Sequence, residues 1–184
     1  MHNTHNRVQW ITRTGVLTAL LIALQWATAG TQAFAGQYIT GSCVNCVLAI
    51  GALFGGLWSS IVVAVLSPFC AFLLGIGPKL IQIVPCIAAG NGVFILCLYF
   101  LIGYKSRPVW QQFCGLLVSA AAKFAVLYTA VVLVVIPVMG DALAPKQVQT
   151  FTAMFSWPQM ITALLGGTAA LLILPVLKKA IKQS

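Results

Sequence analysis

Residues 109–136 read VWQQFCGLLVSAAAKFAVLYTAVVLVVI, and Lys123 is the only charged side chain in this stretch. An α-helix needs about 20 mainly apolar residues to cross the hydrocarbon core of a bilayer. The stretch exceeds that length and carries a single charge, so it predicts a transmembrane helix.

The composition of the whole chain leads to the same conclusion. Of its 184 residues, 61% are hydrophobic and 6% are charged, and the mean hydropathy is +1.03. Soluble domains contain about 25% charged residues, so the composition excludes a water-soluble enzyme and a nucleic-acid-binding domain. We expect an all-α integral membrane protein in which residues 1–184 form a single membrane domain.

Glycine and proline residues divide the apolar sequence into six candidate helices. We expect these spans at about 8–29, 42–53, 57–74, 81–102, 109–136 and 151–177. The segment from Gly30 to Gly41 is rich in Gly, Gln and Thr, which is too polar for lipid and too long for a tight turn. The sequence therefore predicts a six-transmembrane-helix bundle with an outward-facing lid loop after the first helix.

The basic residues predict the orientation of this bundle. The net charge is +9, and alternating spans place most of the charge on the side of the two termini. That side holds Arg7, Arg13, Lys105, Arg107, Lys178, Lys179 and Lys182, and the other side holds Lys79 and Lys146. Basic residues favour the cytoplasmic side, so we expect a multi-pass protein of the cell membrane with both termini in the cytoplasm.

Lys123 lies near the middle of the predicted fifth helix. A cation at this depth costs from about 2.5 to more than 10 kcal/mol unless it is paired or reaches water. Asp141, the only acidic residue, lies beyond the end of this helix. The lysine either snorkels or pairs with carbonyl groups, or it faces a polar cavity and binds a carboxylate or phosphate of a ligand. We expect the last of these.

Polar residues are concentrated in the outer half of the predicted bundle. They are Gln37, Tyr38 and Thr40 in the lid, Asn45 and Asn91 on the second and fourth helices, and Trp157 and Gln159 at the start of the sixth. Any one of them is also explained as a polar contact between helices or an interfacial aromatic residue. Their convergence on one side, together with Lys123, predicts a substrate-binding site there.

A stripe of small residues lies on the first predicted helix, in its cytoplasmic half. Gly15, Ala19 and Ala23 recur every four residues, so they share one face on which another helix can pack closely. That helix belongs either to this chain or to a separate subunit.

The stripe, the six short helices, the long outer loop and the basic ends resemble the substrate-binding S components of energy-coupling factor (ECF) vitamin transporters. The resemblance covers the whole chain, and 40–45 and 90–91 are also similar to family members. It implies a non-catalytic, high-affinity binder without a cofactor. It further implies that Gly15, Ala19 and Ala23 contact a transmembrane coupling subunit, and that two ATPase subunits complete the complex. The chain has no phosphate-binding G-x-x-x-x-G-K-[ST] motif of its own.

Two other classes of protein compete with this interpretation. Cys43 and Cys46 form a CxxC pair, which suits a membrane thiol or redox protein if a helix N-terminus stabilises one thiolate. A small pore or structural partner is the other alternative. The chain has one Asp, no Glu and His only at positions 2 and 5. It therefore offers few acid–base groups for catalysis, and we expect no metal site.

The residue types also suggest a ligand. One lysine, several amides and hydroxyls, and few aromatic rings favour a small, flexible, anionic vitamin, and pantothenate fits this description. Its carboxylate would bind Lys123, and its hydroxyls and amide would bind Asn45, Asn91, Gln159 and residues of the lid. Cobalamin is the alternative, because a glycine-rich lid and amide-bearing walls also suit a large corrinoid fringed with amides.

Overall fold

The computed structural model describes residues 2–29, 33–103 and 107–182, and this part of the chain contains helices and turns but no strand. The α-helices are α1 (His2–Thr28), α2 (Ala33–Ile50), α3 (Leu57–Leu73), α4 (Ile83–Leu98), α5 (Val109–Leu127), α6 (Ile136–Met139), α7 (Pro145–Met154) and α8 (Trp157–Lys182). Three π-helical segments, Gly51–Gly55, Tyr99–Gly103 and Tyr128–Val135, prolong α2, α4 and α5, and a 3-10 turn, Gly140–Ala142, follows α6.

Five helical segments of the described chain are long and apolar enough to cross a membrane. They are Arg7–Thr28, Gly36–Gly55, Ile83–Gly103, Val109–Met139 and Pro145–Lys179. The remaining predicted span, 57–74, corresponds to α3, which is apolar but only 17 residues long. The all-helical membrane character is therefore confirmed, while five rather than six helices reach the length of a span.

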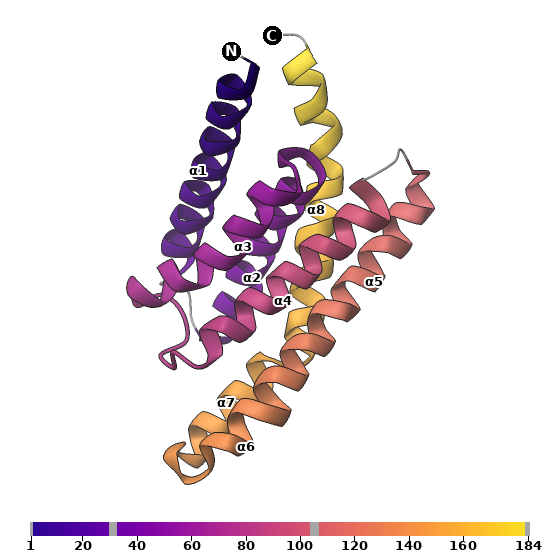
Figure 1. The fold of residues 1–184 in the computed structure, drawn as a ribbon. Helices are drawn as coiled ribbons and strands as arrows, with labels where there is room; N and C mark the ends of the chain where they lie inside the picture. Colours follow the sequence, from indigo (N-terminus) through magenta and orange to yellow (C-terminus); the bar gives the residue numbers. More distant parts are fainter. Residues whose placement is uncertain (1, 30–32, 104–106, 183–184) are drawn as a thin grey trace.

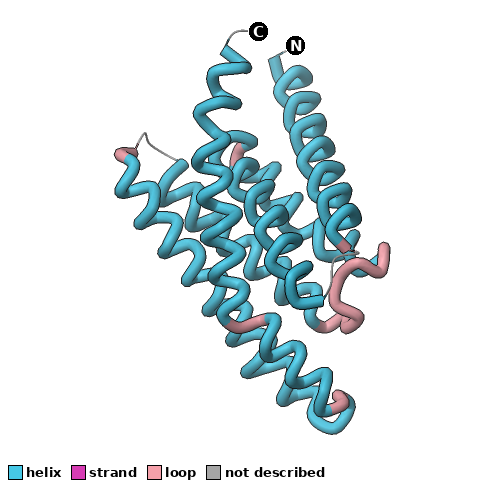
Figure 2. Tube along the Cα trace, turned by 180° about the vertical axis from the view of Figure 1, so that it is seen from behind, coloured by secondary structure: helices cyan, strands magenta, loops and turns pink. Residues whose placement is uncertain are grey.

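The helices form a bundle in which α2 and α8 lie side by side at the centre (Figure 1). Helix α4 packs between α3 and α5, and α1 contacts α2 and α3. Both termini lie at one end of the bundle, and the turn between α6 and α7 lies at the other (Figures 1 and 2). The arrangement of the termini on one side, expected from six alternating helices, is thus present in the fold.

The predicted lid loop is wrong for the residues that the structure describes. Helix α2 begins at Ala33, so the second helix starts well before residue 42; residues 30–32 lie outside the described part of the chain. Tertiary packing explains the difference, because a Cβ atom at Gly41 would lie 2.9 Å from the Thr162 side chain of α8. Close contact between two helices here outweighs the low helix propensity of Gly and Thr.

The fifth helix continues past its predicted end at residue 136. Pro137 does not end it, because α6 follows the π-helical segment Tyr128–Val135 directly and the helical segment runs on to Met139. The sixth predicted helix, 151–177, is instead divided into α7 and α8.

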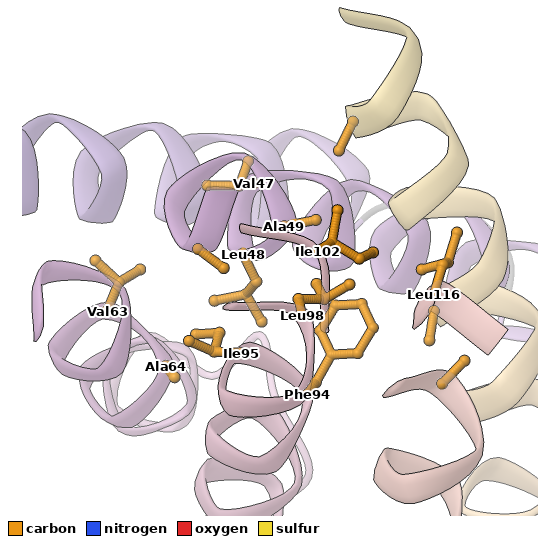
Figure 3. Close-up of a cluster of buried hydrophobic side chains, with 14 of the residues drawn as sticks. Val47, Leu48, Ala49, Val63, Ala64, Phe94, Ile95, Leu98, Ile102 and Leu116 are labelled. Carbon is orange, nitrogen blue, oxygen red and sulfur yellow. The ribbon is translucent and has the colours of Figure 1, made fainter. Parts of the chain in front are cut away.

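Two apolar clusters hold the bundle together. The larger one joins α2, α3, α4, α5 and α8 around Leu48, Phe94, Leu98 and Leu116 (Figure 3). The smaller one joins Leu127 and Val131 to Phe151 and Phe155. It therefore fixes α7 against the long helix that begins at α5.

The closest approach between α2 and α8 depends on Gly166. A Cβ atom at this position would collide with the carbonyl oxygen of Ser42 and lie 2.7 Å from the backbone nitrogen of Cys46. We expect Gly166→Ala to lower the free energy of unfolding by about 1–3 kcal/mol, the usual cost of overpacking. Thermal denaturation of the detergent-purified protein measures this effect.

The matched control is Gly15→Ala, because nothing lies within 4 Å of a Cβ atom at Gly15. This variant should melt at or slightly above the wild-type temperature, because alanine favours the helix more than glycine does. Equal melting of Gly166→Ala and the wild type would contradict the close packing of α2 on α8.

Candidate functional site

Lys123 on α5 is buried among three helices, with only 3% of its surface exposed. Its Nζ donates hydrogen bonds to Asn45 Oδ1 on α2 at 2.6 Å and to Asn91 Oδ1 on α4 at 2.7 Å. The same atom lies 5.4 Å from the centroid of the Phe94 ring, within the range of a cation–π contact. These partners offset the cost of burying the ammonium group.

Helix α8 joins this cluster through Thr162. The amide of Asn45 donates to Thr162 Oγ1 at 3.3 Å, and the Thr162 hydroxyl donates to the carbonyl oxygen of Gln159 at 3.2 Å. The polar residues from α2, α4, α5 and α8 therefore form one continuous network inside an otherwise apolar bundle.

A cavity of about 840 Å³ opens beside this network, at the end of the bundle away from the termini. Its volume is in the range of small-molecule sites, about 300–1,000 Å³. The polar side chains on its wall come from α1, α2, the α3–α4 loop, α7 and α8. They are Gln25, Thr28, Gln37, Thr40, Lys79, Gln147, Gln149, Thr150, Gln159 and Thr162.

The break between α7 and α8 shapes one wall of the cavity. In a continuous helix the carbonyl of Met154 would accept from the N–H of residue 158, but this residue is proline and has no N–H. Two side-chain amides replace that donor. Gln37 Nε2 donates to Met154 O at 2.7 Å, and Gln159 Nε2 donates to the same oxygen at 3.0 Å.

The predicted site residues fall into three groups. Gln37, Thr40 and Gln159 line the cavity. Lys123, Asn45 and Asn91 do not line it, but they connect to its wall through Thr162.

The other two, Tyr38 and Trp157, are not among the lining residues. Tyr38 is half-buried on α2. Trp157 is 67% exposed and stacks on the Phe124 ring with 5.4 Å between the centroids.

Several cavity residues escaped the sequence-based prediction, above all those on α7. Gln147, Thr150 and Met154 are spaced by three and four residues, which places them on one helix face, and all three line the cavity. This spacing was a usable signal, but the sixth helix was expected to begin only at residue 151. Lys79 and Gln25 also line the cavity, and Gln25 is 9% exposed with a buried Oε1 that has no hydrogen-bond partner.

The stripe on α1 is not covered by the described part of the chain. Gly15, Ala19 and Ala23 are exposed. Gly15 and Ala19 line a shallow groove of about 450 Å³ that is shared with Trp10 on α1 and Leu66 on α3. The face is therefore free to receive a helix of another protein.

Cys43 and Cys46 are both free and partly buried on α2. Within the described residues, no group of three or more His, Cys, Asp or Glu side chains comes together.

The polar network makes a prediction about stability. We expect Lys123→Met to lower the free energy of unfolding by about 1–3 kcal/mol, because the two asparagine oxygens would lose their shared donor. Thermal melting measures the loss. Replacing Asn45 and Asn91 by Leu in the same variant should restore part of it, since the two unpaired amide oxygens are then removed and the Thr162 hydroxyl still donates to Gln159 O.

Lys79→Met is the control, because Lys79 is exposed and its removal should not change the melting temperature. A Lys123→Met protein that melts like the wild type would show that the network does not stabilise the fold.

Comparison with known proteins identifies the family. A family model described as "ECF transporter, substrate-specific component" matches residues 9–178, which is nearly the whole chain. No curated protein and no solved structure matches it. The chain belongs to the family of substrate-specific components of ECF transporters.

Proposed function

We propose that this chain is the non-catalytic substrate-specificity subunit of an ECF-type importer and that it binds a vitamin from outside the cell. The observation that carries the proposal is the cavity of about 840 Å³ at the end opposite the termini, whose wall includes glutamine and threonine side chains. A transmembrane coupling subunit and two ATPase subunits supply the movement and the ATP hydrolysis.

The cavity faces outward in this proposal, and both termini lie in the cytoplasm. Arg7, Arg13, Arg107, Lys178 and Lys179 are all exposed and belong to the side expected to be cytoplasmic. Gln147 lines the cavity, so a single cysteine at this position should react with a membrane-impermeant thiol reagent in intact cells. Labelling only after the cells are opened would show that the cavity faces the cytoplasm and that the protein has the opposite orientation.

Pantothenate is the proposed substrate because the cavity wall matches its chemistry. Phe151 is the only aromatic residue among the described lining residues, so a flat aromatic vitamin finds a single ring to stack on. The wall instead offers five glutamine amides and four threonine hydroxyls, which suit the hydroxyls and amide of pantothenate.

The carboxylate of pantothenate has two candidate partners. Lys79 is the only charged residue among the described lining residues, and we place the carboxylate there. Lys123 was predicted from the sequence, but it does not line the cavity, and two of its three N–H donors already bind Asn45 and Asn91. Direct binding by Lys123 stays a prediction.

Cobalamin is the second candidate. The five glutamines on the wall, Gln25, Gln37, Gln147, Gln149 and Gln159, match the amide fringe of a corrinoid as well as they match pantothenate. The cavity is also large for pantothenate alone.

Calorimetric titration of the purified chain with a vitamin panel tests the substrate. We expect tight binding of pantothenate and a loss of about 1.5–3 kcal/mol in Lys79→Met, the scale of a hydrogen bond to a charged group. Lys146→Met is the matched control, because Lys146 is exposed on α7 but does not line the cavity.

Two other results would change this assignment. A folded Lys123→Met variant that loses pantothenate binding, while Lys79→Met keeps it, would move the carboxylate to Lys123. Tight cobalamin binding without a response to pantothenate would replace the substrate and leave the transporter class intact.

The coupling surface is tested separately. We expect Ala19→Trp to abolish co-purification with the coupling subunit and the ATPases, because the indole would fill the groove beside Gly15. Pantothenate binding to the isolated chain should be unchanged. Val118→Trp on the exposed face of α5 is the control, and equal loss of partners in both variants would place the contact elsewhere.

A further inference from the structure

The break between α7 and α8 fixes the orientation of two glutamine side chains. Gln37 and Gln159 both direct Nε2 at the carbonyl oxygen of Met154. A carbonyl oxygen accepts and cannot donate, so only the NH₂ group of each carboxamide can face it. The Oε1 atom of each glutamine must therefore point away from Met154.

These two oxygens are open to the cavity. Both residues line it, and neither Oε1 has a hydrogen-bond partner in the described part of the chain. Among the described residues, the buried side-chain polar atoms without a partner are Gln25 Oε1, Ser42 Oγ and Ser67 Oγ, so the oxygens of Gln37 and Gln159 are not enclosed by protein. Because their amides share one acceptor atom, the two carboxamide groups lie at the same point of the wall.

The hydroxyls nearby already donate within the protein. Thr40 Oγ1 donates to Thr28 Oγ1 at 2.7 Å, and the Thr28 hydroxyl donates to Leu24 O at 2.7 Å. Thr162 donates to the carbonyl of Gln159. This corner of the wall thus offers the two Oε1 acceptors beside the second N–H of each amide. A ligand hydroxyl, which can both donate and accept, suits it.

We propose that the Oε1 atoms of Gln37 and Gln159 bind the two hydroxyl groups of pantothenate and thereby set its orientation in the cavity. The inference rests on the proposed function. The hydroxyl-bearing end lies at the α7–α8 break, where its hydroxyl groups donate to the two Oε1 atoms. The carboxylate end is directed toward Lys79, the cation on the wall.

A matched pair of ligands tests this orientation. Pantothenate is compared by calorimetry with its cyclic acetonide, in which one isopropylidene carbon joins both hydroxyl oxygens and no O–H donor remains. The amide and the carboxylate are unchanged. We expect the acetonide to bind the wild-type chain about 10-fold more weakly or worse, the sum of two neutral hydrogen bonds.

Variants of the protein test whether the two glutamines cause this difference in affinity between pantothenate and the acetonide. In Gln159→Met, pantothenate should bind more weakly and the ratio between the two ligands should shrink to a few-fold. The fold should persist, because Gln37 still donates to Met154 O; Gln37→Met serves in its place if this variant does not fold. Gln149→Met is the control on the same wall and should keep the wild-type ratio.

Each outcome is decisive. Equal affinity of the wild type for the two ligands would overturn the inference and leave pantothenate as the substrate. So would a ratio that is unchanged in both Gln159→Met and Gln37→Met, because the acetonide would then be rejected by bulk elsewhere. Absence of any pantothenate binding would overturn the proposed substrate together with the inference.

Discussion

The buried ammonium group of Lys123 is the constraint on which the bundle depends. In a bilayer, helices gain little from hydrophobic association, since lipid is as apolar as the side chains. A cation inside the bundle must therefore find polar partners, and Asn45 and Asn91 supply them from two other helices. The three helices can satisfy this requirement only in a narrow range of rotations and heights. Thr162 extends the constraint to α8.

Helices α2 and α8 form one wall of the cavity, and hydrogen bonds join this wall at two positions along α2. These contacts explain why the cavity persists beside it. Asn45 contacts Thr162, and Gln37, about two helical turns away, contacts the carbonyl of Met154. Between these ties Gly41 packs directly against Thr162. The second tie exists because Pro158 removes a backbone donor, so a defect in the helix becomes an attachment point for the neighbouring helix. The cavity wall is therefore built by polar contacts as well as by packing.

The sequence predicted those features that depend on the free-energy cost of placing polar groups in lipid. Apolar length and composition identified the helices, and the cost of polar groups in lipid predicted correctly that Asn45 and Asn91 face into the bundle, where both are buried. Lys123 is buried there too, but it pairs with these two amides and does not line the cavity it was expected to face. The prediction of a lid loop was wrong because Gly and Thr favour loops locally. The contact between Gly41 and Thr162 that favours the helix instead is a tertiary contact, which the sequence alone does not show. The cavity face of α7 was missed for a related reason, because the hydrophobic pattern alone set the helix start at residue 151.

The cavity and the groove on the small-residue stripe have two helices in common. Helix α1 contributes Gln25 and Thr28 to the cavity and Gly15 and Ala19 to the groove. Helix α3 contributes Pro68 and Ala71 to the cavity and Leu66 to the groove. In α3 the two sets of residues meet at Pro68, which lies inside the helix and lacks the N–H for a backbone hydrogen bond. The cavity and the groove therefore lie at different heights along one helix pair.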